Sequence, residues 1–399
     1  MRVALLNQYF WPDRSAAGQM MADLAEDLAG AGASVTALAG RQSYTDGALF
    51  PPRETWQGVD IRRVAATAFG RASLWRRGAD HAAFLAAATA RLIGLPDLDV
   101  VLTATTPPLL PLAGLLRKRA RGTRFVYWVH DLFPDAAIEL GLLRRGSPPA
   151  RALERASRAA LEGADAVIAI GACMAERIAA KGVARERVHV VHNWADGAAI
   201  RPLSHQENRF RREHGLGGRF VVLYSGNMGR GHTFDALVAA ARALRPREDV
   251  LFLFIGGGAR RAEVERQARD LPNVRFLPYQ PREDLPMSLG AADLAVVTLR
   301  DEALGVMVPS KLYGYMAAGR PILYVGPAAS TVARVIAEAG CGAAFDGRDP
   351  AAIAGFIEQL AADRARAEAL GRAARRAFGR FDRPRATAEI GRICRRLVA

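Results

Sequence analysis

Hydrophobic residues in the first half of the chain fall into short runs that alternate with segments of helical spacing. Residues 2–10 form an apolar run, and residues 20–32 place apolar side chains three and four positions apart before ending in glycines. Such runs predict strands buried on both faces, and such spacing predicts amphipathic helices. Further strands are expected within 34–40, 99–108, 124–135, 164–171 and 187–196. This alternation predicts a parallel sheet with helices on both faces.

The alternation is interrupted by a polar, strongly charged stretch at 197–219 and then resumes. In the second half, strands are expected within 220–234, 250–258, 274–281, 292–299 and 321–326, and helices at 235–244 and 310–318. Both halves open with a strand, a polar loop containing glycine, and a helix. We therefore expect two Rossmann-like α/β domains, at 1–200 and 201–375, and a C-terminal helix within 376–399 that packs back on the first domain.

The 399 residues carry a formal net charge of +15, and half of them are apolar. This composition supports two cores and argues against disorder. A basic chain favours a polyanionic binding partner, which could be an anionic membrane, a phosphorylated substrate or nucleic acid. The alternative explanation of the charge is that the arginines simply cover solvated faces. Nucleic acid is disfavoured because the sequence shows neither a basic stripe interleaved with aromatic residues nor a recognition-helix module.

Three scattered cysteines, Cys173, Cys341 and Cys394, lack the spacing of metal ligands. They suit a reducing cytoplasm, without disulfides or zinc. No apolar run reaches the length of a membrane span, and the chain opens on a strand pattern rather than on a signal peptide. We therefore expect a cytoplasmic protein.

Two classes of enzyme are disfavoured by motif spacing. No GxGxxG follows the first strand, which argues against a dehydrogenase. Asp97 and Asp99 form an Asp-x-Asp pair that could hold a divalent metal, but the pair directly precedes a strand, so a strand entry is the favoured interpretation. No Ser-His-Asp or Cys-His arrangement is readable. We expect no bound metal and no other cofactor.

The stretch 308–321, VPSKLYGYMAAGRP, has the pattern of a helix that binds an anion. Ser310 is expected to cap the helix, Lys311 lies in its first turn, and Gly319 with Pro321 ends it. The N-terminal N–H groups and the helix dipole attract an anion, to which Lys311 adds a full charge. A phosphate or diphosphate is the natural ligand, and an ordinary capped helix with a surface lysine is the alternative.

Two further loops could approach a phosphate. In 225–231, Gly229 and its neighbouring glycines permit close backbone approach, and Arg230 offers a fork of donors; a simple strand–helix turn is the alternative. In the first domain, Gly18 could let a phosphate or sugar lie against a helix N-terminus, although this signal is weak alone. His130 follows an apolar strand, where it could bind a sugar hydroxyl or be satisfied by local backbone.

The order and spacing of these stretches resemble a known family. They run from YFWPDRSAAGQ near the N-terminus through TTPP, HDLFPD, HNWAD, YSGNMGRG and IGGG to VPSKLYGYMAAGRP. This order resembles the retaining glycosyltransferases of family 4, which have the GT-B fold of two Rossmann-like domains, and most closely the WbuB-like bacterial branch that builds O-antigen, lipopolysaccharide and capsule sugars. The resemblance covers nearly the whole chain.

The resemblance implies a metal-independent transfer from a nucleotide-sugar, with retention at the anomeric carbon. Our first hypothesis for the donor is a UDP-sugar, such as a UDP-N-acetylhexosamine. Gly18 would approach the phosphates and His130 the donor sugar. Asn227 and Arg230 would lie near the diphosphate, which Lys311 and the helix start at Ser310 would neutralise. Tyr279 would stack beside the base, with ordinary packing as the alternative.

The sequence departs from the family pattern at two positions. Many members carry two glutamates seven residues apart, the second of which commonly binds the ribose hydroxyls. Here those positions hold Val306 and Gly314. Glu302 is close enough in sequence to be a substitute. The missing glutamates favour a non-catalytic, nucleotide-binding relative as one alternative. A nucleotide-sugar 2-epimerase is another, but no carboxylate cluster supports it.

An acceptor and membrane surface is expected in the first domain. Residues 69–92 combine Trp75 with Arg76 and Arg77, and an apolar helix at 109–116 continues into a basic end that begins with Arg117. Basic and aromatic residues beside apolar ones suit an anionic bilayer and a lipid-linked or saccharide acceptor. We therefore expect the protein to be peripheral on the cytoplasmic face of the membrane. A core helix is the alternative for the apolar face of 109–116.

Overall fold

The structure is a computed structural model that describes residues 1–13, 15–43, 47–65 and 74–399, with the side chains of 74–77 outside that description. The chain divides into two compact units, each described by itself below. The first unit contains Met1–His192, Gly305–Met307 and Pro384–Ala399, and the second contains Asn193–Leu304 and Val308–Arg383. The boundary that sequence analysis places at residue 200 therefore falls at 192 in the structure.

The first unit is built on one sheet of eight strands within the described residues, in the order β3-β4-β2-β1-β5-β6-β7-β8. All neighbours are parallel except β3, which runs antiparallel to β4 at the edge. The strands are β1 (Arg2–Leu6), β2 (Ser34–Gly40), β3 (Arg53–Trp56), β4 (Val59–Val64), β5 (Val100–Thr103), β6 (Arg124–Val129), β7 (Ala166–Ala169) and β8 (Val188–Val190).

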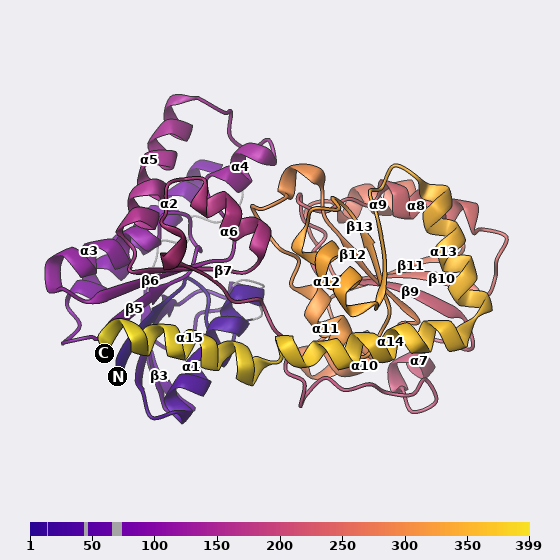
Figure 1. Cartoon of the computed structure of the whole chain (residues 1–399), viewed down its shortest axis with the longest axis horizontal. Helices are drawn as coiled ribbons and strands as arrows, with labels where there is room; N and C mark the ends of the chain where they lie inside the picture. The colour runs from indigo at the N-terminus through magenta and orange to yellow at the C-terminus, as the bar shows by residue number, and fades with distance from the viewer. Residues whose placement is uncertain (14, 44–46, 66–73) are drawn as a thin grey trace. The chain divides into compact units, whose positions relative to one another are not determined.

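Helices connect and cover these strands, as Figure 1 shows. They are α1 (Ala16–Gly30), α2 (Leu74–Ile93), α3 (Pro111–Arg121), α4 (Asp135–Glu139), α5 (Pro148–Gly163), α6 (Ala172–Ala179) and α15 (Arg383–Val398). The last helix, α15, lies along α1, where the Thr387 hydroxyl donates to the Asp27 carboxylate over 2.7 Å. The C-terminal residues thus complete the unit that the N-terminal residues begin.

The second unit has a six-stranded parallel sheet in the order β11-β10-β9-β12-β13-β14. Its strands are β9 (Phe220–Ser225), β10 (Val250–Ile255), β11 (Val274–Leu277), β12 (Leu294–Thr298), β13 (Ile322–Val325) and β14 (Gly342–Phe345). Its helices are α7 (Arg209–Glu213), α8 (Asp235–Ala243), α9 (Arg261–Gln267), α10 (Leu285–Gly290), α11 (Lys311–Ala317), α12 (Thr331–Ala339), α13 (Pro350–Ala362) and α14 (Arg364–Phe378). In chain order this is the 3-2-1-4-5-6 arrangement of a Rossmann sheet.

Each sheet has a point at which the strand order reverses. In the first sheet β1 lies between β2 and β5, and in the second β9 lies between β10 and β12. The connections that leave these central strands go to opposite sides, so their loops separate at the carboxyl edge and leave room for a ligand. The loops that follow β1 and β9 are therefore the first places to look for a site.

The strands expected from the apolar runs are present, and the structure adds three that the pattern did not reveal. β3 alternates exposed and half-buried residues, β4 alternates buried and half-buried residues, and β14 is short and mostly half-buried. None of the three forms a continuous apolar run. Within the described residues, no helix is long and apolar enough to cross a membrane.

Candidate functional site

The most unusual charge in the second unit is the ammonium of Lys311, in the first turn of α11. Its Nζ lies 3.4 Å from the centroid of the Tyr224 ring at the end of β9. The same Nζ is buried and has no hydrogen-bond partner among the described residues. Burial lowers the pKa of Lys311 well below its ordinary value. A buried ammonium whose charge is compensated only by an aromatic ring is stabilised further when an anion binds beside it.

The helix start itself differs from the expectation. Ser310 precedes α11, but it has helical backbone angles and its side chain makes no capping hydrogen bond. The prediction that Ser310 caps the helix is therefore wrong, because a capping side chain requires an extended residue at that position. The end of the helix was predicted correctly: Gly319 adopts a left-handed φ of 64° just beyond α11.

The loop after β9, residues 226–231, lies beside Lys311. A Cβ placed on Gly226 would come within 3.7 Å of Lys311 Nζ, and Gly226 has a φ of 127°. The N–H groups of Gly226 and Met228 donate to the carbonyls of Ile255 and Gly257. In contrast, the N–H groups of Asn227, Gly229 and Arg230 donate no hydrogen bond to any described residue. Unpaired N–H groups near a cation are suited to bind an anion.

The glycines at 256–258 allow this arrangement. A Cβ on Gly256 would overlap the carbonyl of Gly226, and one on Gly258 would overlap the Asn227 side chain. The loop after β10 can therefore lie directly against the loop after β9. The side chains of Asn227 and Arg230 are both exposed, and Arg230 makes no ion pair among the described residues. The loop thus leaves a second cation available beside Lys311.

His232 directly follows this loop along the chain, and no role was predicted for it from the sequence. Its Nδ1 is 2.7 Å from the Thr298 carbonyl oxygen, so Nδ1 carries the proton and donates it. Burial, and then the nearby Lys311 charge, lower the pKa of His232 to about 3. His232 is therefore neutral and adds no positive charge next to Lys311. In the sequence, only its position just after the glycine-containing loop that follows β9 could have marked it as a candidate site residue.

Tyr279 and Glu302 occupy the edges of this region. Tyr279 is 55% exposed, and its hydroxyl donates to the Gly257 carbonyl over 3.3 Å. Its ring therefore lies over the glycine loop with much of its surface accessible. Glu302 is exposed and accepts two hydrogen bonds from the Arg300 guanidinium, which lower the pKa of Glu302. Its carboxylate is already paired, which weakens the case for Glu302 as the substitute ribose ligand.

The two positions that hold no glutamate have different surroundings. Val306 is fully buried, and its carbonyl accepts from the Leu132 N–H over 2.8 Å within the first unit. Gly314 is half-buried on α11, where an added Cβ would lie 3.2 Å from Leu289 Cδ1 of α10. The glycine at 314 thus allows α10 and α11 to pack closely. A side chain there would require Leu289 Cδ1 to move by a few tenths of an ångström.

In the first unit, buried polar groups face the ends of the central strands. His130 follows β6, packs on Trp128 with ring centroids 4.3 Å apart, and has a pKa that burial lowers to about 4. Its Nε2 is buried without a hydrogen-bond partner in the described part of the chain. Asn7 follows β1, and its Oδ1 is likewise buried and unpaired there, while its Nδ2 donates to the Tyr9 carbonyl. These unpaired atoms are suited to bind hydroxyl groups.

Gly18 lies in the first turn of α1, where its N–H donates to the Ser15 hydroxyl over 3.1 Å. A Cβ there would lie 2.6 Å from Ser15 Oγ and 3.1 Å from the Tyr9 carbonyl. The glycine is therefore explained by close packing of the preceding loop against the helix start. Nothing in this geometry requires a phosphate, and the ligand role of Gly18 stays a prediction.

Arg117 was expected on the membrane surface, but it is 1% exposed. Its guanidinium donates to the Thr123 hydroxyl and to four carbonyls at and beyond the end of α2, those of Leu92, Ile93, Leu95 and Pro96. The expectation is wrong because the apolar-to-basic spacing cannot reveal that an arginine turns inward to cap a neighbouring helix. The side chains of Trp75, Arg76 and Arg77 lie outside the described residues.

The Asp-x-Asp pair is a strand entry, as expected. Asp99 accepts from the Arg2 N–H over 2.7 Å and from the Arg2 guanidinium over 3.2 Å, which ties the start of β5 to the start of β1. In the described ranges, no group of three or more His, Cys, Asp and Glu side chains could hold a metal ion.

Two family models match the chain. A glycosyl transferase 4-like domain matches residues 15–194, and the glycosyl transferases group 1 model matches residues 206–377. The chain is 31% identical to glycosyltransferase WbjE of Pseudomonas aeruginosa, over 66% of each chain. It is 30% identical to the colanic acid biosynthesis glycosyl transferase WcaI of Escherichia coli (strain K12), over 51% of each chain. The chain thus spans about two thirds of the length of WbjE and about half of the length of WcaI.

Solved structures share the whole fold. A sucrose-phosphate synthase from Thermosynechococcus elongatus superposes with a TM-score of 0.80 at 20% identity and covers 100% of this chain and 99% of its own. Anabaena HepE in complex with UDP-glucose superposes with a TM-score of 0.74 at 16% identity, over 98% of this chain and 99% of its own. At these identities the likeness shows the fold, which is GT-B.

Proposed function

This chain belongs to the glycosyltransferases, with a 4-like domain followed by a group 1 domain, and on that premise we propose that it transfers a sugar from a UDP-sugar to an acceptor. The transfer retains the anomeric configuration. The acceptor is a lipid-linked or free saccharide that becomes part of a bacterial surface polysaccharide. The name of WcaI, a colanic acid biosynthesis transferase, and the UDP-glucose held by HepE support this choice of donor and product.

The observation that carries the proposal is the buried, unpaired ammonium of Lys311. A diphosphate beside it would supply the missing partner and restore the charge that burial disfavours. The N–H groups of Asn227, Gly229 and Arg230, which have no partner among the described residues, belong to the loop whose Gly226 lies beside Lys311. In glycosyl transfer, negative charge grows on the diphosphate as it leaves, so fixed donors here would stabilise the transition state.

Cations of the chain itself carry this role in the proposal. Lys311 is fixed by the Tyr224 ring, and the exposed Arg230 supplies a planar fork of donors that suits a phosphate. His232 is neutral and hydrogen-bonded to the Thr298 carbonyl, so it does not compete for the phosphate charge. The proposed transfer therefore requires no metal ion.

In the first unit, the proposal assigns sugar contacts to His130. Since burial keeps the imidazole neutral, its unpaired Nε2 either accepts a hydrogen bond from a sugar hydroxyl or, in the other tautomer, donates one to the hydroxyl oxygen. A lipid-linked acceptor and the net charge of +15 are the basis for placing the protein at the cytoplasmic face of an anionic membrane.

The test is calorimetric titration of the full chain with UDP, GDP and ADP in a chelator-containing buffer. We expect UDP to bind, and we expect about a hundredfold loss of affinity in Lys311→Ala, because a buried charge pair loses one partner. Arg348→Ala, a change of an exposed residue elsewhere in the second unit, is the control. Absence of binding by all three nucleotides would overturn the proposal.

Catalysis needs a separate measurement, because the missing glutamates favour a relative that binds nucleotide without turnover. Release of UDP from UDP-sugars is followed with and without extracted bacterial lipid acceptors. Turnover that Lys311→Ala abolishes supports the transferase, whereas tight UDP binding without turnover of any UDP-sugar supports the non-catalytic alternative.

A further inference from the structure

The loop between α4 and α5 presents apolar and basic side chains to solvent. Leu142 is 55% exposed, and Leu143 beside it is half-buried. Arg144 and Arg145 follow, and both are exposed. Arg145 also pairs with Glu139 of α4 over 2.9 Å. In Figure 1 this loop forms the outer end of the first unit, beside α4 and α5.

Hydrogen bonds fix the shape of this loop. The N–H groups of Leu142 and Leu143 both donate to the Ala137 carbonyl, over 2.8 and 3.0 Å. The Ser147 N–H donates to the Arg144 carbonyl over 3.2 Å, and the Ser147 hydroxyl caps the first turn of α5. The leucines are therefore presented by a formed turn, so little conformational entropy is lost when the loop contacts a partner.

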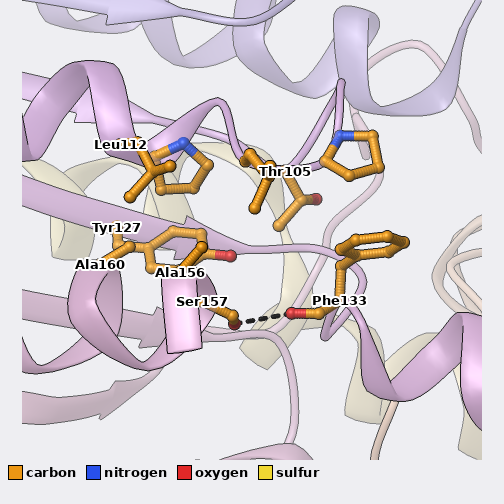
Figure 2. Close-up of a pocket in the computed structure, with 10 residues that line it drawn as sticks. Thr105, Leu112, Tyr127, Phe133, Ala156, Ser157 and Ala160 are labelled. Atoms are coloured by element: carbon orange, nitrogen blue, oxygen red, sulfur yellow. Dashed lines mark hydrogen bonds between the residues drawn. The ribbon is translucent and has the colours of Figure 1, made fainter. Parts of the chain in front are cut away.

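The inner face of α5 is fixed to the rest of the first unit. Figure 2 shows Ala156, Ser157 and Ala160 of α5 lining a small cavity, together with Tyr127 of β6. Ser157 Oγ donates to the carbonyl of Phe133, in the loop after β6, over 2.7 Å. The opposite face of α5 therefore points away from the sheet.

Three arginines lie on this outer face of α5. Arg151, Arg155 and Arg158 are four and three residues apart, which places them on one side of the helix, and all three are exposed. None of them forms an ion pair with a described residue. Between 141 and 160 the sequence contains five arginines and a single acidic residue, Glu154. The loop and the outer face of α5 therefore form a positively charged surface with leucines at one end.

We propose that this surface binds an anionic lipid bilayer. The α5 surface, as it is called below, consists of Leu142, Leu143, Arg144, Arg145, Arg151, Arg155 and Arg158. Its guanidinium groups donate to lipid phosphates, and its two leucines enter the boundary between headgroups and acyl chains. The inference rests on the proposed function, because it names the face through which the transferase meets the membrane that holds its acceptor.

The composition of the α5 surface favours a bilayer over other polyanions. Nucleic acid would pair with the arginines through its phosphates but would leave the exposed leucines without an apolar partner. A protein interface would be expected to centre on aromatic anchors, and the α5 surface contains no aromatic side chain. Arginines around leucines match the headgroups and acyl chains of an anionic leaflet.

The α5 surface begins at the edge of the sheet that carries the proposed sugar contacts. Helix α5 follows β6 and leads into β7, so its first turn and the loop before it lie at the carboxyl edge of the sheet. His130, directly after β6, lies at the same edge. A bilayer at the α5 surface therefore brings a lipid-linked sugar to the edge where His130 lies.

The first test is flotation of the full chain with vesicles at low salt. Vesicles of phosphatidylglycerol and phosphatidylethanolamine are compared with vesicles of phosphatidylcholine alone, and we expect binding only to the anionic vesicles. The triple variant Arg151→Gln, Arg155→Gln, Arg158→Gln should bind them about a hundredfold more weakly, since each arginine near an anionic surface contributes about fivefold. Leu142→Ala should weaken binding about tenfold, because less apolar surface enters the bilayer.

A matched variant in the second unit separates this surface from the effect of net charge. Arg245, Arg266 and Arg269 are also exposed, and none forms an ion pair with a described residue. Changing all three to glutamine removes the same charge, and we expect it to lower vesicle binding by no more than about twofold. All substituted side chains are exposed, so the unfolding midpoints of both triple variants should equal that of the wild type.

A dye on the loop reports insertion directly. Cys173, Cys341 and Cys394 are buried, so a cysteine introduced at an exposed position can be labelled selectively. We expect an environment-sensitive dye on Leu142→Cys to emit at shorter wavelengths when anionic vesicles are added. The same dye on Glu248→Cys, at an exposed position of the second unit, should not change.

Several outcomes would overturn the inference. One is failure of the wild type to bind anionic vesicles, even if it binds heparin through the same arginines, since the partner would then be another polyanion. Equal losses in the two triple variants, unchanged binding of Leu142→Ala, or a dye at position 142 that stays in water would each do the same. The UDP titration of the same preparations separates the two proposals: Lys311-dependent UDP binding without vesicle binding shows that the membrane surface is wrong, and the proposed donor site stands.

Discussion

Lys311 and Tyr224 form a contact in which an ammonium lies 3.4 Å from the centre of an aromatic ring and has no hydrogen-bond partner among the described residues. The ring compensates the charge only in part, because a cation–π contact supplies less than full hydration or an anion does. The burial of this charge therefore costs stability in the second unit, and the proposed anion would offset that cost.

We expect Lys311→Met to bind UDP about a hundredfold more weakly and yet to unfold at an equal or higher denaturant concentration. The folded state has a lowered Lys311 pKa, so the unfolded state binds more protons up to pH 10.5. Wild-type stability should therefore rise with pH, relative to Lys311→Met, from the folded pKa up to that value. Urea unfolding at several pH values measures this difference, and a variant less stable than wild type at pH 7 would contradict it.

A second prediction concerns His130 and acid. Its pKa is about 4 in the folded protein and 6.5 when unperturbed, so the unfolded state takes up the proton first as the pH falls below 6.5. At pH 5 this costs about 2 kcal/mol of stability. The loss of stability between pH 7 and pH 5 should be smaller by that amount in His130→Gln. The same unfolding curves on His81→Gln, a histidine on α2, serve as the control.

Arg117 should behave as a structural residue. Arg117→Ala removes the donor for four carbonyls and one hydroxyl in a buried place, so we expect a loss of about 3 kcal/mol or more in unfolding free energy. Arg119→Ala, an exposed change on the same helix α3, should stay within about 0.5 kcal/mol of wild type. Equal effects of the two changes would show that the inward hydrogen bonds of Arg117 contribute nothing.

Gly314 allows a test of the missing ribose ligand. We expect the wild type to bind UDP and 2′,3′-dideoxy-UDP with similar affinity, since no glutamate stands at 314. The double variant Gly314→Glu with Leu289→Ala, in which the neighbouring side chain is shortened to make room, should prefer UDP by about tenfold, as for one charge-assisted hydrogen bond. Calorimetry with both nucleotides measures this preference. A wild type that already discriminates would show that another residue binds the ribose.

The regular part of the fold was predictable, because parallel strands buried on both faces leave continuous apolar runs. The expected strand at 34–40 coincides with β2, whereas the run at 2–10 yields a strand only to Leu6. The strand ends at Leu6, and in the loop that follows, the Asn7 side-chain amide donates to the Tyr9 carbonyl. The strands β3, β4 and β14 escaped prediction because they are partly exposed.

The candidate site was predictable only in part, for a different reason. The sequence has three lysines, and Lys311 is the one that precedes a glycine and a proline typical of a helix end. Its neighbours along the chain could be read directly. Its contact with Tyr224 links positions far apart in sequence, and so does the turn of Arg117 toward the end of α2. Ser310 shows the reverse error, since a residue type suited to capping takes helical backbone angles here. Side-chain direction is set by packing, which spacing does not encode.

The path of the chain through the first unit affects how the protein is made. Helix α15 places Ile390 and Ile393 in buried positions, and its Thr387 bonds Asp27 of α1, yet it is synthesised only after the whole second unit. The second unit, by contrast, is almost contiguous in sequence. The first unit is therefore completed only after the second unit has been synthesised, and until then the side of α1 that α15 covers stays exposed.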